Sequence, residues 1–384
     1  MRGAAEALVC GGSSGSRGAM NKPRVLMVTR IPFWRMGAGE RTRVLALVWL
    51  LGAHCRLSLL YLGPLGDSER QLLTRLRVQA EIHAIAGAAP DVQDAAVERA
   101  CFQQLCTEQT FDACIFQRLS VHALREHLPE GVAAVLDTHD LESQAAESRR
   151  QQAVPVQTRL SWEQELALFS QYQRVLLIQA EDHARVQAAQ GERALLTPHP
   201  VQFAALPVQP ARRRLGLVGS DWSANLHGLD WFADEVWPRL VDRVEGIEMH
   251  LFGWLSDRWR PEFTGFQRHG FVADFKQAWG AIDVAINPVR WGAGLKIKSV
   301  EALGHGLPLV TTLEGARGLP EDGSRALLRC DEPASFADAC ARLLEDGQAR
   351  AEMAAAAHAY ARQHFSPQAC FEPLLRWLQQ QVRA

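Results

Sequence analysis

The chain has 384 residues, which is more than one ordinary hydrophobic core supports, so two domains are expected. Its formal net charge of -2 disfavours a dedicated nucleic-acid binder, because such proteins usually carry a clear positive excess. No apolar stretch approaches the roughly 18 residues that a membrane span requires, which disfavours an integral membrane protein. The 8 cysteines include no C-x-x-C pair, and free cysteines predict a reducing, cytoplasmic compartment.

Residues 1–21 are rich in Gly, Ser and Ala and lack the continuous apolar centre of a signal peptide. We therefore predict a disordered leader here, with Met20 as an alternative start of the protein. The rest of the chain contains no internal repeat and no further low-complexity segment.

From residue 22 to residue 205, short apolar runs alternate with segments of helical periodicity. Strands are predicted at 24–29, 56–62, 81–85, 113–117, 133–137, 174–180 and 194–197, and helices at 40–51, 69–76, 92–106, 121–127 and 158–172, with another beginning near 181. Such alternation is typical of a doubly wound parallel sheet. Ligands of these sheets bind beyond the carboxyl ends of the strands.

Polar residues follow the predicted strand at 133–137. Asp137, His139, Asp140 and Glu142 lie where side chains face the ligand cleft of such a sheet. A metal site is disfavoured, because these side chains share one turn and the sequence offers them no distant partner. An alternative role for Asp140 is to cap the helix that follows.

Residues 203–211, with Pro207 and Pro210, predict a hinge between two domains. Beyond it, strands are predicted at 214–218, 248–252, 284–286, 309–312 and 326–329, and helices from 223 to 240 and at 295–303, 333–345, 349–364 and 371–382. The second half therefore repeats the strand–helix alternation of the first half.

The most informative passage is the glycine loop that leads into the helix at 295–303. Gly292 and Gly294 permit unusual backbone angles, and the start of a helix offers free N–H groups to an anion. Lys296 and Lys298 place two cations in the first turn, where the helix dipole disfavours them unless an anion is bound. A diphosphate would satisfy both lysines, and Glu301 could accept hydrogen bonds from a sugar diol. The alternative is an ordinary strand–helix turn with a solvated lysine pair.

This passage resembles the donor-binding segment of glycosyltransferase family 4, the retaining GT-B enzymes also called glycosyl transferases group 1. The matching residues have the same order and spacing as one branch of that family: Pro288, Gly292, Gly294, Lys296, Lys298, Glu301, Gly306 and Pro308. One position departs from the wider family, in which a Glu that contacts the donor hexose stands where this chain has Ala293. Recognition of the sugar would then rest on backbone groups or other residues.

The resemblance implies an α/β GT-B fold, with two facing Rossmann-like doubly wound domains and a cleft between them. Residues 22–205 would form the acceptor domain and residues 206–365 the nucleotide-sugar donor domain. Residues 366–384 would form a helix that crosses back to the first domain.

The resemblance also assigns the site. Catalytic roles fall to His139, which would donate a hydrogen bond to the leaving phosphate, and to Lys296 and Lys298. The implied donor-binding residues are Gly39, Arg43, Gly219, Ser220, Phe271, Val272, Arg290, Gly292, Ala293, Gly294, Leu295 and Glu301. Asp140 and Glu142 would hold the acceptor. No metal and no cofactor are expected, because lysines and helix dipoles serve the phosphates of a UDP-type or GDP-type co-substrate.

The implied reaction moves a sugar from a nucleotide diphosphate sugar to a hydroxyl of a saccharide, lipid-linked or protein-linked acceptor in glycan biosynthesis. Two alternatives stay open: a GT-B nucleotide-sugar epimerase, and a non-catalytic sugar-nucleotide-binding subunit, which Ala293 favours. No nucleic-acid partner is expected. A solvated helix face is the favoured interpretation of Arg70, Arg75 and Arg77, and weak association with the inner face of the cell membrane is the alternative.

Overall fold

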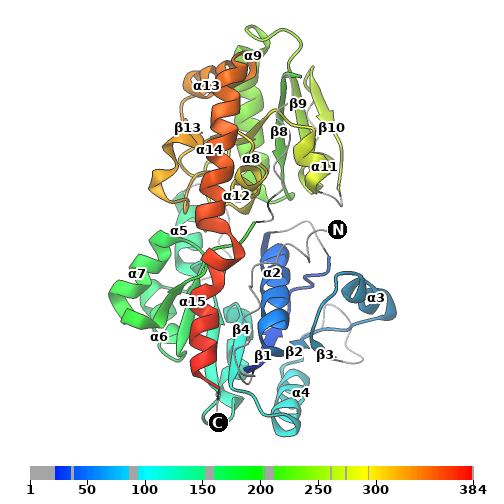
Figure 1. Cartoon of the computed structure of the whole chain (residues 1–384), viewed down its shortest axis with the longest axis vertical. Coiled ribbons are helices and arrows are strands. Elements are labelled where there is room, and N and C mark those ends of the chain that lie inside the picture. Colours follow the sequence, from blue (N-terminus) through cyan, green and yellow to red (C-terminus); the bar gives the residue numbers. More distant parts are fainter. Residues whose placement is uncertain are drawn as a thin grey trace, which may run out of the picture.

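A computed structural model describes residues 22–35, 39–85, 94–151, 160–201, 203, 212–259, 262–272, 275–292 and 294–382. The described chain forms two parallel sheets, and helices flank each of them (Figure 1). The prediction of two doubly wound α/β domains is confirmed. The predicted leader and Ala293 lie outside the described residues, as does the predicted hinge apart from Phe203.

The first sheet contains seven strands in the order β3-β2-β1-β4-β5-β6-β7, all paired in parallel. Its strands are β1 (Arg24–Thr29), β2 (Arg56–Tyr61), β3 (Glu81–Ala84), β4 (Ala113–Gln117), β5 (Ala133–Asp137), β6 (Arg174–Leu177) and β7 (Ala194–Leu196). Its helices are α2 (Gly39–His54), α3 (Asp67–Arg75), α4 (Ala95–Glu108), α5 (Glu142–Gln151), α6 (Trp162–Phe169) and α7 (Ala180–Gln190), with 3₁₀ segments η1 (Leu119–His127) and η2 (Gly191–Arg193).

The second sheet contains six strands in the order β10-β9-β8-β11-β12-β13, again parallel. Its strands are β8 (Arg214–Val218), β9 (Glu248–Phe252), β10 (Phe266–Arg268), β11 (Val284–Asn287), β12 (Leu309–Thr311) and β13 (Leu327–Arg329). Its helices are α8 (Ser223–Trp231), α9 (Trp237–Val241), α10 (Trp254–Arg258), α11 (Phe275–Gly280), α12 (Ile297–Gly304), α13 (Pro333–Glu345) and α14 (Gly347–Phe365), with a π segment η3 (Phe232–Val236) and a 3₁₀ segment η4 (Glu321–Arg325).

Several predicted elements differ from the observed ones. The helix expected at 121–127 is the 3₁₀ segment η1, and the strand expected at 174–180 ends at Leu177, because α7 begins at Ala180. The helix expected from 223 to 240 is interrupted by η3. Pro238 has no N–H to donate, so the helical hydrogen-bond pattern shifts just before α9. Sequence periodicity did not predict β10, α10 or α11.

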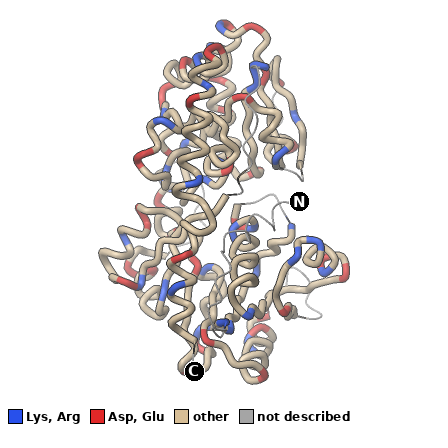
Figure 2. Tube along the Cα trace, viewed as in Figure 1, with Lys and Arg blue, Asp and Glu red and all other residues tan. Residues whose placement is uncertain are grey.

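Buried apolar side chains cover both faces of each sheet. In β1, the side chains of Val25 through Val28 are completely buried, which explains the continuous apolar run of this central strand. Because the sheets bury both faces, polar side chains gather at the strand ends. Figure 2 shows Lys and Arg interspersed with Asp and Glu over both domains, with no single-sign face in that view.

The C-terminal helices join the two domains. Helix α14 packs on α12 of the second domain, and α15 (Pro367–Gln380) continues downward in Figure 1 to pack against β7 of the first domain. Ser366 marks the change of direction, because its side chain caps α15 and Pro367 begins the new helix. In the described part of the chain, no helix has the length and apolar character that crossing a membrane requires.

Candidate active site

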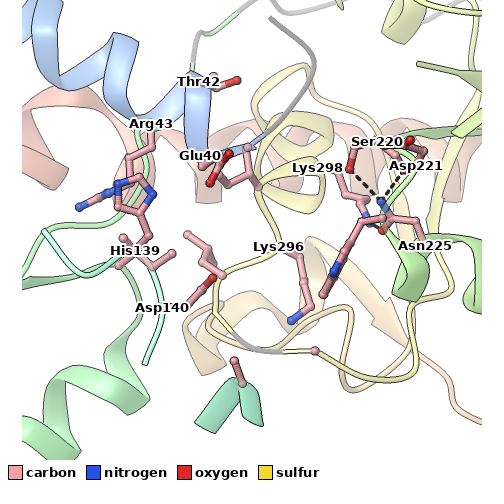
Figure 3. A pocket seen from close by; sticks show the side chains of 18 of the residues that line it. Glu40, Thr42, Arg43, His139, Asp140, Ser220, Asp221, Asn225, Lys296 and Lys298 are labelled. Atoms are coloured by element: carbon pink, nitrogen blue, oxygen red, sulfur yellow. Dashed lines mark hydrogen bonds between the residues drawn. The ribbon is translucent and has the colours of Figure 1, made fainter. Parts of the chain in front are cut away.

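A cavity of about 1040 Å³ lies between the two domains, at the carboxyl ends of both sheets. Residues that follow β4 and β5 face residues that follow β8 and β9 across it (Figure 3). The predicted site residues that line it are Gly39, Arg43, His139, Asp140 and Glu142 from the first domain, and Gly219, Ser220, Phe271, Val272, Gly292, Leu295, Lys296, Lys298 and Glu301 from the second. A parallel sheet places loops from distant parts of the sequence together in this way.

Lys296 occupies the N-cap position of α12, and its side chain is 5% exposed. Its Nζ donates to Glu314 Oε1 at 2.9 Å and to the carbonyl oxygen of Gly294 at 3.1 Å. The ammonium group is therefore oriented by two acceptors of its own domain while it lines the cavity. Glu314 was not predicted as a site residue, since only the fold brings it next to Lys296.

Lys298 lies two residues further along, in the first turn of α12, where its ammonium group donates to Asn225 Oδ1 of α8 (Figure 3). Asn225 in turn donates from Nδ2 to the carbonyl oxygen of Ser220 at 2.9 Å. Burial lowers the pKa of Lys298 to about 7, with a further lowering by Lys296 and an opposite effect of Glu301. An anion bound beside this lysine would favour its charged form.

Glu301 lines the same part of the cavity and interacts electrostatically with Lys298. Burial raises the pKa of Glu301 to about 7, although the neighbouring Lys298 lowers it. Near neutral pH, this carboxyl group can therefore accept a hydrogen bond as a carboxylate or donate one as an acid.

Arg43 lies in the wall of the cavity, but its guanidinium group binds inside the first domain. It contacts Asp137 through Nε (3.0 Å) and Nη2 (2.7 Å), and Thr197 through its carbonyl oxygen (2.9 Å). Both Arg43 and Asp137 are almost completely buried. Although burial favours the neutral acid, the charge of Arg43 holds the pKa of Asp137 below its usual value. The geometry therefore gives Arg43 a structural role in joining α2, β5 and β7.

His139 adopts a left-handed backbone conformation, with φ of 63°, which is uncommon for a residue with a side chain. Its Nε2 lies 2.8 Å from Gln117 Oε1 and 3.7 Å from Asp137 Oδ2, so this nitrogen carries the proton. Burial lowers the pKa of His139 to about 3, and the imidazole is neutral at physiological pH. In this tautomer Nδ1 is an acceptor, which differs from the predicted hydrogen-bond donation to a phosphate.

Asp140 does not cap α5. The N–H groups of Glu142 and Ser143 donate instead to the carboxylate of Glu165 at 2.7 and 3.2 Å, so the capping alternative is wrong. The Asp140 side chain extends toward the second domain, where a Cβ at Gly294 would overlap its Oδ1. Burial raises the pKa of Asp140, and the charges of Arg118 and Lys296 oppose that change.

Some predicted phosphate-binding N–H groups already have partners. The N–H of Gly219 donates to the carbonyl oxygen of Phe252 at 3.0 Å, within the second sheet. The N–H of Gly292 donates across the domain interface to Ser148 Oγ at 2.9 Å. The glycine loop of the second domain therefore contacts the first domain directly.

The structure places Arg290 away from the cavity, in contrast to its predicted position. Its guanidinium group lies over the ring of Trp231, 4.7 Å from the centroid, and donates to the carbonyl oxygen of Asp331 at 3.1 Å. This cation–π contact and the exposed position explain why Arg290 does not turn toward the phosphate region.

At the other end of the cavity, Phe271 and Val272 follow β10. Phe271 is 39% exposed and stacks on Trp254, with ring centroids 5.2 Å apart. Two further tryptophans, Trp222 and Trp291, line the cavity next to Gly292. Neither tryptophan was singled out as a site residue, because single aromatic residues in a loop carry no positional signal.

A charged pair in the part of the cavity wall that the first domain forms was not predicted from the sequence. Arg118, which follows β4, donates from Nη1 to Glu40 Oε2 of α2 at 2.8 Å, and both residues line the cavity. The rule that ligands bind beyond carboxyl strand ends would have identified Arg118. Among the described residues, no group of three His, Cys, Asp or Glu side chains is arranged to hold a metal ion.

Comparison with solved structures shows that the two facing domains have the GT-B fold. A crystal structure of TarM matches with a TM-score of 0.71 and 8% identity, over 93% of this chain and 98% of that chain. Anabaena HepE, solved with UDP and glucose, matches with a TM-score of 0.63 and 16% identity, over 93% and 99% of the two chains. A mutant of S. aureus TarM with Fondaparinux, alpha-GlcNAc-glycerol and UDP gives 0.58 and 12%, over 73% of this chain. The present chain covers 59% of the length of that last one.

The sequence comparison is more specific for the second domain. Residues 212–346 match the family model described as glycosyl transferases group 1. No curated protein sequence matches the chain. The matched segment contains α12 and its glycine loop, which is the passage that carries the sequence resemblance.

Proposed function

We propose that the protein is a retaining glycosyltransferase of family 4. It would transfer a sugar from a nucleoside diphosphate sugar, of UDP or GDP type, to a hydroxyl of a saccharide, lipid-linked or protein-linked acceptor. The observation that carries the proposal is the position of Lys296 and Lys298. They meet at the start of α12, in a cavity whose opposite wall presents His139 and Asp140.

The chemistry needs a neutralised leaving group. As the bond to the sugar breaks, negative charge grows on the diphosphate, and two ammonium groups with the positive end of a helix stabilise it. In this proposal the lysines replace a metal ion. Glu301, one turn along α12, would accept hydrogen bonds from the ribose hydroxyls.

The acceptor would enter from the first-domain side, where Asp140 and Glu142 line the cavity. A partly buried carboxyl group with a raised pKa is suited to hold and deprotonate a hydroxyl near neutral pH. Retention fits a front-face departure of the leaving group, in which attack occurs on the side that the diphosphate leaves. The neutral imidazole of His139, with Nδ1 as an acceptor, would bind a sugar hydroxyl rather than a phosphate oxygen.

A donor screen tests the proposal. We expect UDP or GDP, and one of their sugars, to raise the melting temperature, because the ligand binds only the folded state. UDP is the first nucleotide to test, because the structures of Anabaena HepE and of the S. aureus TarM mutant were solved with it. Transfer to a hydroxyl acceptor with an unchanged anomeric configuration, followed by proton NMR, would support the proposal. Isomerisation of the donor without any acceptor would instead identify an epimerase, and tight binding without turnover would identify a binding subunit.

A further inference from the structure

One loop of the second domain contacts both the phosphate region and the first domain. The loop lies between β12 and η4 and carries Glu314 and Arg317. The Glu314 carboxylate accepts from Lys296 Nζ through Oε1 at 2.9 Å, and its Oε2 lies 3.6 Å from Arg317 Nη1. Glu314 thus joins a cation that lines the cavity to a cation at the domain interface.

Arg317 crosses that interface. Its Nη2 and Nε form a two-pronged contact with the carboxylate of Glu181 in α7, at 3.0 and 3.2 Å. In the amide orientation that satisfies its partners, Gln144 of α5 accepts from Arg317 Nη2 at 2.7 Å and donates to Asp182 at 3.0 Å. The Arg317 side chain is 25% exposed and the Glu181 side chain is 58% exposed, so the guanidinium end of this ion pair is shielded from solvent and the carboxylate end is not.

The backbone of the same loop is seated on the first domain. Gly318 has a φ of 83°, and a Cβ at this position would lie 2.6 Å from Gln179 Oε1, just before α7. A side chain there would hold the domains apart. The loop therefore approaches the first domain as closely as glycine allows, beside the ion pair.

We propose that Glu314 and Arg317 are positioning residues that couple domain closure to the orientation of Lys296. Glu314 orients the ammonium group, and Arg317 binds Glu314 and Glu181 together when the domains are closed. The contacts run from Lys296 through Glu314 and Arg317 to Glu181. Through them, the closed conformation that brings Asp140 to Gly294 also orients the ammonium group of Lys296. The inference rests on the proposed function, because it assigns Lys296 to the leaving diphosphate.

Coupling between domain closure and ligand binding predicts the direction in which each substitution changes the affinity. A ligand that touches both domains binds the closed state, so its apparent affinity falls with the fraction of closed molecules. Loss of the Arg317–Glu181 contact should lower that fraction. Loss of Glu314 should leave the contact between Arg317 and Glu181 across the interface intact, and it should disturb Lys296 and the pairing of Glu314 with Arg317 inside the second domain. The two substitutions therefore have different expected signatures.

The experiment compares Arg317→Gln, Glu181→Gln, their double variant and Glu314→Gln in the full chain. We expect either single interface variant to enlarge the radius of gyration in X-ray scattering and to weaken UDP or GDP binding about tenfold. The double variant should match Arg317→Gln, because Glu181→Gln removes no further contact of Arg317 once the guanidinium group is gone. Glu314→Gln should weaken nucleotide binding without opening the molecule. The matched control, Arg243→Gln with Asp338→Asn, removes an ion pair of 2.6 Å inside the second domain and should change neither measurement.

Additive effects of Arg317→Gln and Glu181→Gln would overturn the proposal, and so would an unchanged radius of gyration in both variants. Opening by Glu314→Gln would also overturn it, because the assigned roles would then be reversed. Scattering of the ligand-free variants separates this inference from the proposed function. A wild-type chain that binds no nucleotide refutes the donor assignment, and the role of Lys296 in this inference falls with it. Its domain-closure part is still decided by the scattering of the four variants.

Discussion

At the scale of single residues, Lys298 is the group on which the proposed chemistry depends most. Its ammonium group is held by Asn225 next to Lys296, and burial brings its pKa to about 7. A lysine in this environment gains most from a bound diphosphate, because the ligand adds opposite charge to that of Glu301, the acidic neighbour within the described part of the chain.

Replacement of this side chain should slow the reaction. We expect Lys298→Ala to lower kcat/KM for the sugar donor by about 2 kcal/mol or more of transition-state stabilisation, because the leaving group loses a charged donor. Steady-state kinetics would measure the change, and Lys276→Ala, on α11 and away from the cavity lining, is the matched control. Unchanged turnover in Lys298→Ala would refute its catalytic role.

Nucleotide binding should also take up protons near neutral pH. Because burial lowers the pKa of Lys298 to about 7, part of the ligand-free protein carries a neutral amine at this position near neutral pH. A bound diphosphate favours the ammonium form, so the complex gains a proton that is taken from the buffer. Calorimetry in buffers of different ionisation enthalpy would detect it, and Lys298→Met should abolish most of it. The uptake should vanish below about pH 5, where the lysine is already charged.

Lys298 and Glu301 together make the stability of the ligand-free protein depend on pH. The folded pKa of Lys298 lies below the unfolded value, so the unfolded chain binds more protons between pH 7 and 10.5, and this contribution to stability rises with pH there. The folded pKa of Glu301 lies above the unfolded value, so its contribution falls as pH rises from 4.5 through 7. The pair therefore costs the ligand-free protein most stability near neutrality, where a bound anion would help it most.

At the scale of elements, loops at strand ends determine how the two sheets meet. Gly294 has a φ of 69° and lies against Asp140 of the opposite domain, whereas Gly191 has a φ of 60° with open space around it. Both glycines have a positive φ, which disfavours a side chain, and they differ in their surroundings, so they can be compared.

We expect Gly191→Ala to cost about 1 kcal/mol of stability, from the backbone conformation alone. Gly294→Ala should have a similar backbone cost, and its Cβ should also force the domains apart at Asp140, so nucleotide-dependent activity should fall at least tenfold, about 1.4 kcal/mol. Chemical denaturation and steady-state kinetics on both variants would separate the effects. Equal kinetics in the two variants would contradict the interface role of Gly294.

The elements also show what the sequence can predict. The strands β4 and β5 have the predicted bounds, because apolar runs buried on both faces end at polar residues. Strand β10 was missed, because only Phe266 of its three residues is apolar and the other two are exposed. The glycine loop and the two lysines were located through their spacing. Their partners were not, since Glu314 and Asn225 reach the lysines only through contacts between distant segments.

At the scale of the whole molecule, α15 is the element that ties the domains together. Trp377 is buried against the first domain, and the guanidinium group of Arg174 lies over its ring at 5.3 Å. Leu374 and Leu378 are completely buried on the same helix. The helix thus completes the apolar core of a domain to which it does not belong in sequence.

Removal of this contact should destabilise the first domain. We expect Trp377→Ala to lower the free energy of unfolding by about 3 kcal/mol, since it leaves a large cavity in a packed core. Thermal unfolding, followed by far-ultraviolet circular dichroism, would measure this loss of stability. Arg376 is an exposed neighbour that forms a surface ion pair with Glu372, so Arg376→Ala should change stability by less than about 0.5 kcal/mol. Equal losses in both variants would argue against the packing role.

The two passages between the domains lie next to each other. The N–H of Val201 donates to the carbonyl oxygen of Phe365 at 2.9 Å, so the outgoing and the returning chain are joined where they cross. The ring of Phe203 meets that of His358 close by, with centroids 5.8 Å apart. These two contacts hold the described ends of the two passages together and oppose their separation. We therefore expect the two domains to open and close by rotation about this point. Each closure should then return Lys296 to the same position opposite Asp140.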